Sequence, residues 1–314
     1  MIEIVKCLPG CTVQDMGRSG YRRLGVGSSG AVDQLSLITG NTLLGNTPNA
    51  AGLEILLFPI VIRFLRDCSF SVTGAPNQAS LDGVLLPPCW KSGAKAGQIL
   101  RVDGTAKGGI NYLCIAGGFL VPTVLGSAST DLKGAFGGLE GRMLQASDVL
   151  DTVHSGPSYN PSSFGAAAYP SVANQTLRVL PGFELQALSE QQQELFLSST
   201  WTVSRRSNRI GYRLEGPSLA FDRPIELLSY GFVPGLVQLP PSGQPIVMLA
   251  DAQTSGGYPR LGSIIDSDLR LLAQSAPGTP VQLRACTLNE ALAAERDEHR
   301  FIDQLRRLRE IMFP

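Results

Sequence analysis

Short apolar segments separated by turn residues dominate the hydrophobic pattern of this chain. Clusters of Pro, Gly and Asp divide the segments, and several of them are rich in Ile, Val and Phe, which is typical of β-strands. We expect strands at residues 2–5, 53–64, 70–74, 97–103, 110–118, 226–228, 236–239 and 246–250. The pattern predicts a mainly β protein.

Helical signals are fewer. From Leu35 to Leu44 the apolar spacing fits one helix, with Asp33 as its N-cap and Gly45 as its stop. The clearest helix follows Thr287, which forms a capping box with Glu290. Its apolar face comprises Leu288, Leu292, Ile302, Leu305, Leu308 and Met312. Two shorter helices are expected, one capped by Ser189 and one near 267–274.

Two domains are favoured by the length of 314 residues, which exceeds the size at which one core is usual. Residues 156–174 are rich in Ser, Pro, Gly, Ala and Asn and are the best candidate for a linker. The predicted domains are 1–155 and 175–286, followed by a C-terminal helix at 287–314. Both halves contain the sequence R-x-G-Y-R after an L-P-G turn, which suggests internal duplication.

Composition and charge exclude several classes of protein. Charged residues make up 17% and the hydrophobic set 43%, as in a globular chain. Lys plus Arg equals Asp plus Glu at 26 each, so no overall field favours nucleic acid or an anionic membrane. The amino terminus does not resemble a signal peptide, and no apolar window is long enough for a membrane span. We expect a cytoplasmic protein.

The cysteines and histidines restrict the possible chemistry. Six cysteines show neither a C-x-x-C pair nor regular spacing, so zinc sites and disulfides are not expected. The chain has two histidines, His154 in a Ser/Gly/Pro-rich stretch and His299 in a charged helix. A Ser-His-Asp triad or a His-based metal site would have to use one of them. We therefore expect carboxylates, arginines, hydroxyls and amides to perform any chemistry, and no bound metal.

The stretch at 246–260 is the strongest local candidate for a site. Five apolar residues predict a buried strand that ends at Asp251, after which Gln253 and Thr254 add an amide and a hydroxyl. Gly256 and Gly257 allow close approach of the backbone to a ligand. The alternative is an ordinary hairpin turn with polar residues facing water.

Arginines in glycine-rich loops indicate an anionic small molecule. Arg18, Arg209 and Arg213 each present a planar fork that fits a carboxylate or phosphate. The alternative for each is a structural salt bridge with Asp15, Asp33 or Glu215. In residues 123–150, the polar side chains Ser127, Ser129, Thr130, Asp131 and Lys133 could line a pocket, or could belong to a solvated loop.

Four long motifs carry a family resemblance. They are QDMGRSGYRRLGVGSSGAVD, LGSASTDLKGAFGGLEGR, SNRIGYRLEGP and VQLPPSGQPIVMLADAQTSGGYPRLG. In this order they closely resemble the KipA family, also called allophanate hydrolase subunit two or the biotin-dependent carboxyltransferase family. The resemblance runs from Ile2 to about Ala294. It implies two cyclophilin-like β-barrel domains in tandem with a C-terminal α-helix.

The resemblance also implies an activity and partners. The implied reaction is the ATP-dependent opening of 5-oxoproline to glutamate, in a complex with a KipI-like subunit and a third subunit. ATP would be bound together with these partner subunits. Alternatives are a regulatory protein that sequesters a KipI-like kinase inhibitor, and the carboxyltransferase component of a urea carboxylase-like system, because fold alone does not decide the reaction.

Residue roles follow from residue type within this resemblance. We expect Asp15, Asp251, Gln253 and Thr254 to orient the amide and transfer protons. We expect Arg18, Arg209 and Arg213, together with Tyr258, Ser129 and Thr130, to bind the substrate. A further expectation is that the guanidinium groups of the two halves converge beside Asp251.

Overall fold

The computed structural model describes residues 1–104, 109–153, 159–160, 162–166, 176–223 and 225–313. Most of the predicted linker at 156–174 lies outside these ranges. The chain forms two compact units. Unit 1 comprises Met1–Arg18, Ser29–Pro170 and His299–Pro314, and unit 2 comprises Ser19–Ser28 and Ser171–Glu298. Each unit therefore contains a short segment from the other half of the sequence.

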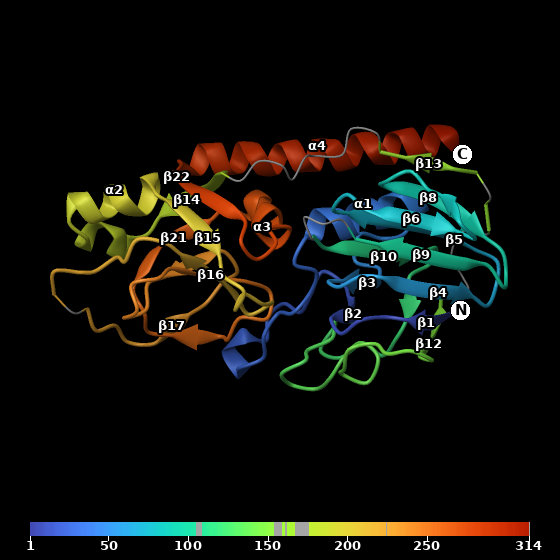
Figure 1. Cartoon of the computed structure of the whole chain (residues 1–314), viewed down its shortest axis with the longest axis horizontal. Helices are drawn as coiled ribbons and strands as arrows, with labels where there is room; N and C mark the ends of the chain where they lie inside the picture. Colours follow the sequence, from blue (N-terminus) through green and yellow to red (C-terminus); the bar gives the residue numbers. More distant parts are fainter. Residues whose placement is uncertain (105–108, 154–158, 161, 167–175, 224, 314) are drawn as a thin grey trace. The chain divides into compact units, whose positions relative to one another are not determined.

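Unit 1 contains two antiparallel sheets (Figure 1). The seven-stranded sheet has the order β11 (Phe119–Leu120), β12 (Val149–Thr152), β1 (Ile2–Lys6), β4 (Ile60–Phe64), β9 (Ile99–Asp103), β6 (Gln78–Leu81), β7 (Val84–Leu85). The six-stranded sheet has the order β13 (Phe164–Gly165), β8 (Trp90–Ala94), β5 (Cys68–Gly74), β10 (Asn111–Ile115), β3 (Gly52–Ile55), β2 (Cys11–Gln14). The segment predicted at 53–64 thus supplies β3 to one sheet and β4 to the other.

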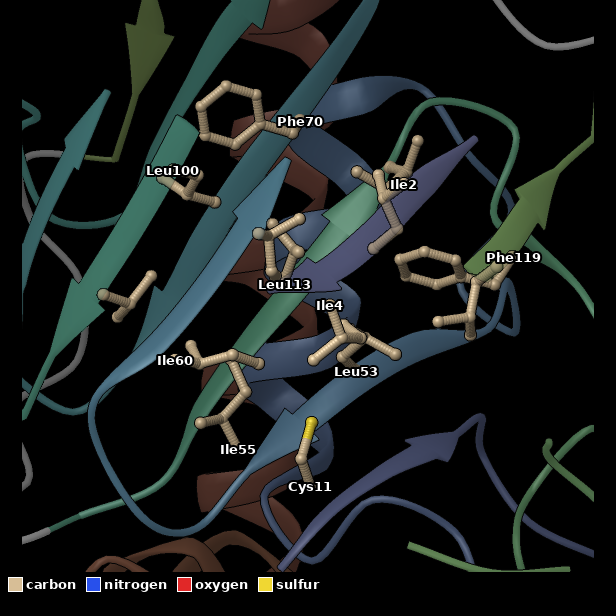
Figure 2. Close-up of a cluster of buried hydrophobic side chains, with 14 of the residues drawn as sticks. Ile2, Ile4, Cys11, Leu53, Ile55, Ile60, Phe70, Leu100, Leu113 and Phe119 are labelled. Atoms are coloured by element: carbon tan, nitrogen blue, oxygen red, sulfur yellow. The ribbon is translucent and has the colours of Figure 1, made fainter. Parts of the chain in front are cut away.

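One hydrophobic core holds the two sheets of unit 1 together. The labelled side chains in Figure 2 come from both sheets: Ile2, Ile4, Ile60, Leu100 and Phe119 from the larger, and Cys11, Leu53, Ile55, Phe70 and Leu113 from the smaller. Alternate residues of β1 and β4 point into this core, as the two-residue period of a strand requires. Full burial of each large aliphatic side chain stabilises the fold by about 1.5–3 kcal/mol.

Helix α1 (Gln34–Leu44) packs on the six-stranded sheet against β5 and β10. The Asp33 carboxylate accepts from Ser36 N at 3.0 Å, and Gly45 ends the helix in the left-handed conformation, so the predicted helix and both of its caps are confirmed. Contact with the sheet is close at Gly40, where a Cβ atom would lie 2.8 Å from Cys114 Sγ.

Unit 2 is built around a closed barrel (Figure 1). Its strand order is β14 (Thr176–Pro181), β21 (Arg260–Ile264), β18 (Leu236–Gln238), β19 (Ile246–Met248), β16 (Gly211–Glu215), β15 (Thr200–Val203), β22 (Pro280–Ala285). A parallel pairing of β22 with β14 closes the barrel, and the other pairings are antiparallel. The mainly β prediction is confirmed. Residues 226–228, however, do not form the predicted strand.

Short elements surround this barrel. Helix α2 (Glu190–Ser198) begins at the predicted cap Ser189 and packs on β22. Helix α3 (Asp266–Ala273) lies where a helix was expected. The remaining elements are η1 (Arg22–Leu24), η2 (Phe183–Ala187) and a two-stranded ribbon of β17 (Tyr230–Gly231) with β20 (Ser255–Gly256). No helix among the described residues is long and apolar enough to cross a membrane.

Helix α4 (Leu288–Met312) contributes to both units. The predicted capping box is present, since Thr287 N donates to Glu290 Oε2 at 2.8 Å and Glu290 N to Thr287 Oγ1 at 3.2 Å. In unit 2, Ala294 packs with Ile265 and Cys286, and in unit 1 Leu305 packs with Leu43. The predicted apolar face is only partly correct, because Leu288, Leu292, Leu308 and Met312 are exposed.

Candidate functional site

An ion pair between Arg209 and Asp251 anchors the polar loop of unit 2. Strand β19 ends at Met248, two residues before the predicted end, and Asp251 follows in a turn. Asp251 accepts from Arg209 Nε at 2.8 Å and from Arg209 Nη2 at 2.9 Å, while Asp251 N donates to the Arg209 carbonyl at 3.0 Å. The exposed fractions of the two side chains are 8% for Arg209 and 15% for Asp251. This planar, two-bond pair fixes the orientation of a carboxylate that solvent still reaches.

The other predicted residues of this loop follow Asp251 closely in the sequence, and none of them is buried. Gln253 is exposed and Thr254 is half-buried, and the Thr254 carbonyl accepts from Phe232 N at 3.0 Å. Tyr258 is exposed, and its carbonyl accepts from the Tyr230 hydroxyl. The loop therefore presents a carboxylate, an amide and a hydroxyl on a backbone that pairs with β17 rather than forming an isolated hairpin turn.

Arg213 occupies a different position from Arg209. It lies within β16, where its side chain is exposed on a strand whose neighbour Leu214 is buried. Its backbone N donates to Ser207 Oγ at 3.1 Å. In unit 2, the hydrogen bonds bring Arg209 to Asp251, while Arg213 projects from the barrel strand.

In unit 1, Asp15 lies at the centre of a buried hydrogen-bond network. It is 2% exposed and its carboxylate accepts four hydrogen bonds. The donors are Gly17 N at 2.8 Å, Ala128 N at 2.7 Å, Ser127 Oγ at 2.6 Å and Ser129 Oγ at 2.6 Å. These bonds attach the loop after β2 to the loop at 127–129. The geometry suits a carboxylate that holds two loops together.

Arg18 and Thr130 reinforce the same connection. Arg18, 3% exposed, donates through Nε to the Val124 carbonyl at 3.1 Å and through Nη2 to the Ser129 carbonyl. Its guanidinium carbon lies 4.6 Å from the centre of the Phe136 ring. Thr130 Oγ1 donates to the Val13 carbonyl at 3.0 Å. The structure thus brings four predicted residues, Asp15, Arg18, Ser129 and Thr130, into one buried cluster within unit 1. The convergence of guanidinium groups from the two halves stays a prediction.

A second ion pair, between the half-buried Arg260 and the buried Glu184, was not expected from the sequence and supports the loop of Asp251. Arg260, at the start of β21, donates through Nε to Glu184 Oε2 at 3.0 Å and through Nη2 to Oε1 at 2.5 Å. Its guanidinium lies 4.4 Å from the centre of the Tyr230 ring, and Tyr230 donates to the Tyr258 carbonyl. Glu184 precedes Arg260 by 76 residues, and no local sequence signal connects them.

The titration of Glu184 gives this support a measurable pH dependence. Hydrogen bonds from Arg260 hold the pKa of Glu184 below its ordinary 4.5, against the opposing effect of burial. A lowered folded-state pKa means that the pair contributes its full stability above about pH 4.5 and loses it as the pH falls through the folded-state pKa.

Glu184→Gln is therefore expected to lower the free energy of unfolding by about 1–2 kcal/mol at pH 7, a value reduced by the partial exposure of Arg260. The difference from wild type should shrink below pH 4.5. Urea unfolding of both proteins at several pH values from 7 to 3 measures this difference in the free energy of unfolding. Glu3→Gln, which removes the exposed pair with Arg63, is the control and should change stability by less than about 1 kcal/mol. A difference for Glu184→Gln that is independent of pH would contradict the ion-pair explanation.

A cavity of about 410 Å³ lies elsewhere in unit 2. It is lined by Thr176, Arg178, Ser267, Asp268, Arg270, Leu271, Arg284, Ala294, Asp297 and Glu298, none of which was a predicted site residue. The lining contains three arginines and three carboxylates, so its formal charges balance. Arg178 forms a bidentate pair with Asp268, at 2.9 Å from Nε and 2.6 Å from Nη2. Among the residues with described structure, no group of three or more His, Cys, Asp or Glu side chains could hold a metal ion.

Comparisons with known proteins agree with the motifs. The family described as "Carboxyltransferase domain, subdomain A and B" matches residues 24–285. The Haemophilus influenzae protein named as the C subunit of 5-oxoprolinase is 41% identical over 308 residues, covering 98% of both chains. Its Escherichia coli namesake is 42% identical over 305 residues, covering 97% of both chains.

Among solved structures, K. lactis urea amidolyase matches with a TM-score of 0.88 and 27% sequence identity, over 97% of this chain but 20% of that chain. Sequence and fold thus match over nearly the whole of this chain, and the resemblance carried by the four motifs is confirmed. The chain belongs to the carboxyltransferase-domain family.

Proposed function

We propose that this chain is one subunit of an ATP-dependent 5-oxoprolinase, which opens 5-oxo-L-proline to L-glutamate while ATP is hydrolysed to ADP and phosphate. The strongest support is the similarity to two proteins named as the C subunit of 5-oxoprolinase, because each alignment covers nearly all of both chains. The urea amidolyase match, in contrast, corresponds to only a fifth of that longer chain.

The chemistry requires activation of an unreactive amide. Because an unstrained lactam hydrolyses slowly, phosphoryl transfer from ATP to the lactam oxygen would first make its carbon more electrophilic. Water then adds to that carbon, the ring C–N bond breaks with a proton delivered to nitrogen, and a second water releases phosphate from the glutamyl product. The reaction consumes two waters for each ATP.

In this proposal Asp251 is the residue that exchanges a proton with the lactam or with water. Arg209 fixes the orientation of its carboxylate, and solvent reaches it. Gln253 and Thr254 supply an amide and a hydroxyl beside it, suited to hydrogen bonding with the lactam group. Asp15 and Arg18, whose hydrogen bonds bind two loops of unit 1 together, position backbone in that unit.

ATP is a substrate here, and we propose that the partner subunits help to bind it. The sequence contains no G-x-x-x-x-G-K-[ST] loop for nucleotide phosphates. The proposed partners are a KipI-like subunit and a third subunit. The relatives are named as one lettered subunit of their enzyme, which implies a multi-subunit complex for those proteins.

Reconstitution tests the proposal. The three subunits are purified separately, mixed with 5-oxoproline, ATP and Mg²⁺, and assayed for glutamate and ADP. We expect equal amounts of both products with all three subunits and none when this chain is omitted. Stable binding to the KipI-like partner without glutamate formation by the complete mixture would contradict the enzyme assignment and support the regulatory alternative.

Carboxyl transfer is the second candidate function, because the fold matches urea amidolyase over nearly this entire chain. The same preparations are incubated with carboxybiotin and urea. Consumption of carboxybiotin that depends on urea and on this chain would favour carboxyl transfer, whereas we expect none.

A further inference from the structure

Residues Ser19–Ser28 come from the first part of the sequence but pack within unit 2. We call this segment the strap. We propose that the strap holds the loop of Asp251 in its working conformation and that Arg22 is the positioning residue that attaches it. The importance of this loop for turnover rests on the proposed function, whereas the attachment itself is a property of the fold.

Arg22 and Ser28 connect the strap to two points of unit 2. Arg22 donates through Nη1 to the Phe232 carbonyl and through Nη2 to Ser28 Oγ at 2.9 Å. Ser28 Oγ in turn donates to the Ala250 carbonyl at 3.3 Å. Ala250 directly precedes Asp251, so one guanidinium group supports both the residue before the candidate carboxylate, through Ser28, and the residue that follows β17.

Phe232, which accepts a hydrogen bond from Arg22, also contacts the far side of the loop. Its backbone N donates to the Thr254 carbonyl at 3.0 Å, next to the paired residues of β17 and β20. Phe232 is 2% exposed and packs in a cluster with Met248 and Ala252. A Cβ atom on Gly256 would lie 2.3 Å from the Phe232 ring, which shows how closely the loop backbone rests on it. Residues 250–256 are therefore held at both ends by groups that contact the strap.

The strap itself has a defined conformation. Arg22 begins the 3-10 helix η1, in which Leu24 N donates to the Tyr21 carbonyl and Gly25 N to the Arg22 carbonyl, both at 2.9 Å. Arg22 is half-buried, and burial lowers the pKa of its guanidinium. A planar guanidinium reaches two acceptors in fixed directions, whereas the single ammonium of lysine does not reproduce that geometry.

Arg23 provides a matched control. It is the next residue in η1, carries the same charge and is exposed. Arg22→Lys and Arg23→Lys therefore make the same chemical change at adjacent positions, but only the first removes the bidentate attachment. Ser28→Ala removes the link to Ala250 and the acceptor of Arg22 Nη2, but it keeps the bond from Arg22 Nη1 to the Phe232 carbonyl, so it is a milder second variant.

Hydrogen exchange of the purified chain tests the strap without reference to activity. In Arg22→Lys, the amides of Phe232, Asp251 and Ala252 should exchange about tenfold faster or more, because loss of a hydrogen-bonded support increases local opening. Barrel amides such as that of Val247 should be unchanged, and Arg23→Lys should match wild type. Ser28→Ala should accelerate exchange of the Asp251 and Ala252 amides more than exchange of the Phe232 amide. Equal exchange in Arg22→Lys and Arg23→Lys would overturn the proposal.

Turnover by the reconstituted complex provides the second measurement. We expect Arg22→Lys to lower kcat about tenfold with little change in the KM for 5-oxoproline, since the loop remains present but is less often correctly oriented. If the wild-type complex does not turn over 5-oxoproline, the proposed function is refuted. The hydrogen-exchange result alone then tests whether the strap holds the loop of Asp251. Faster exchange with unchanged kcat would overturn the role of Arg22 in turnover.

Discussion

Arg209→Lys is expected to reduce kcat/KM for 5-oxoproline by about 100-fold or more, while unit 2 remains folded and the complex still assembles. Lysine keeps the charge but cannot donate in parallel to both oxygens of Asp251, as Arg209 does at 2.8 and 2.9 Å. A carboxylate that transfers a proton must be held within a fraction of an ångström, and misplacement by about 1 Å costs on the order of 100-fold in rate.

Steady-state formation of glutamate and ADP by the three-subunit mixture measures this effect. Arg205→Lys is the control, because Arg205 is exposed in the turn before β16 and should leave the rate within about twofold of wild type. Circular dichroism and thermal unfolding verify that the barrel is intact. If Arg209→Lys retained the wild-type rate, the orientation of Asp251 by this pair would not matter for turnover.

Asp15→Ala is expected to lower the free energy of unfolding by about 3–5 kcal/mol. The change leaves four donors in unit 1, two backbone amides and two hydroxyls, without the carboxylate that accepts from them, and all but the Gly17 amide are buried. This loss is a large fraction of the total stability of a typical domain, about 5–15 kcal/mol. Asp15 would then be essential for folding whatever its part in chemistry.

Urea unfolding of the isolated chain, monitored by far-UV circular dichroism, gives this free energy. Asp67→Ala is the comparison within the same unit, because Asp67 is exposed and accepts from Ala96 N at 2.8 Å. It should cost about 1 kcal/mol or less. Equal losses in the two variants would show that the buried network contributes little, and a proton-transfer role would then be the better explanation for Asp15.

Local signals in the sequence predicted the helices well. The caps of α1 and α4 lie within three residues of the groups that they satisfy, Asp33 with Ser36 and Thr287 with Glu290, so short-range chemistry fixes their starts. Strand β19 was predicted two residues too long because Leu249 and Ala250 are apolar and buried although they lie in a turn. Burial, rather than strand geometry, explains their apolar character.

The site was harder to predict because its contacts are long-range. The salt-bridge alternative paired Arg209 with Asp15, Asp33 or Glu215, whereas its partner is Asp251, 42 residues away, beside which the site hypothesis placed it. The antiparallel pairing of Gly211 with Met248 brings them together, since both lie just beyond this end of the ladder. Periodicity predicts a strand but not its neighbour.

The repeated R-x-G-Y-R motif illustrates the same limit. Arg18 donates to backbone carbonyls in unit 1, whereas Arg209 pairs with a carboxylate in unit 2. Similar residues therefore make different contacts in the two halves. Ser19–Ser28 likewise packs within unit 2 and makes hydrogen bonds to Phe232 and Ala250, which are 210 and 222 residues from their donors.

The packing of Leu305 on Leu43 has a consequence for biosynthesis. Residues 299–312 belong to unit 1, yet a ribosome makes them after all the strands of both units. A nascent chain thus leaves the apolar surface around Leu43 and Cys89 uncovered while unit 2 is being translated. Unit 1 consequently acquires its final packing only after unit 2 has been synthesised and α4 has left the ribosome.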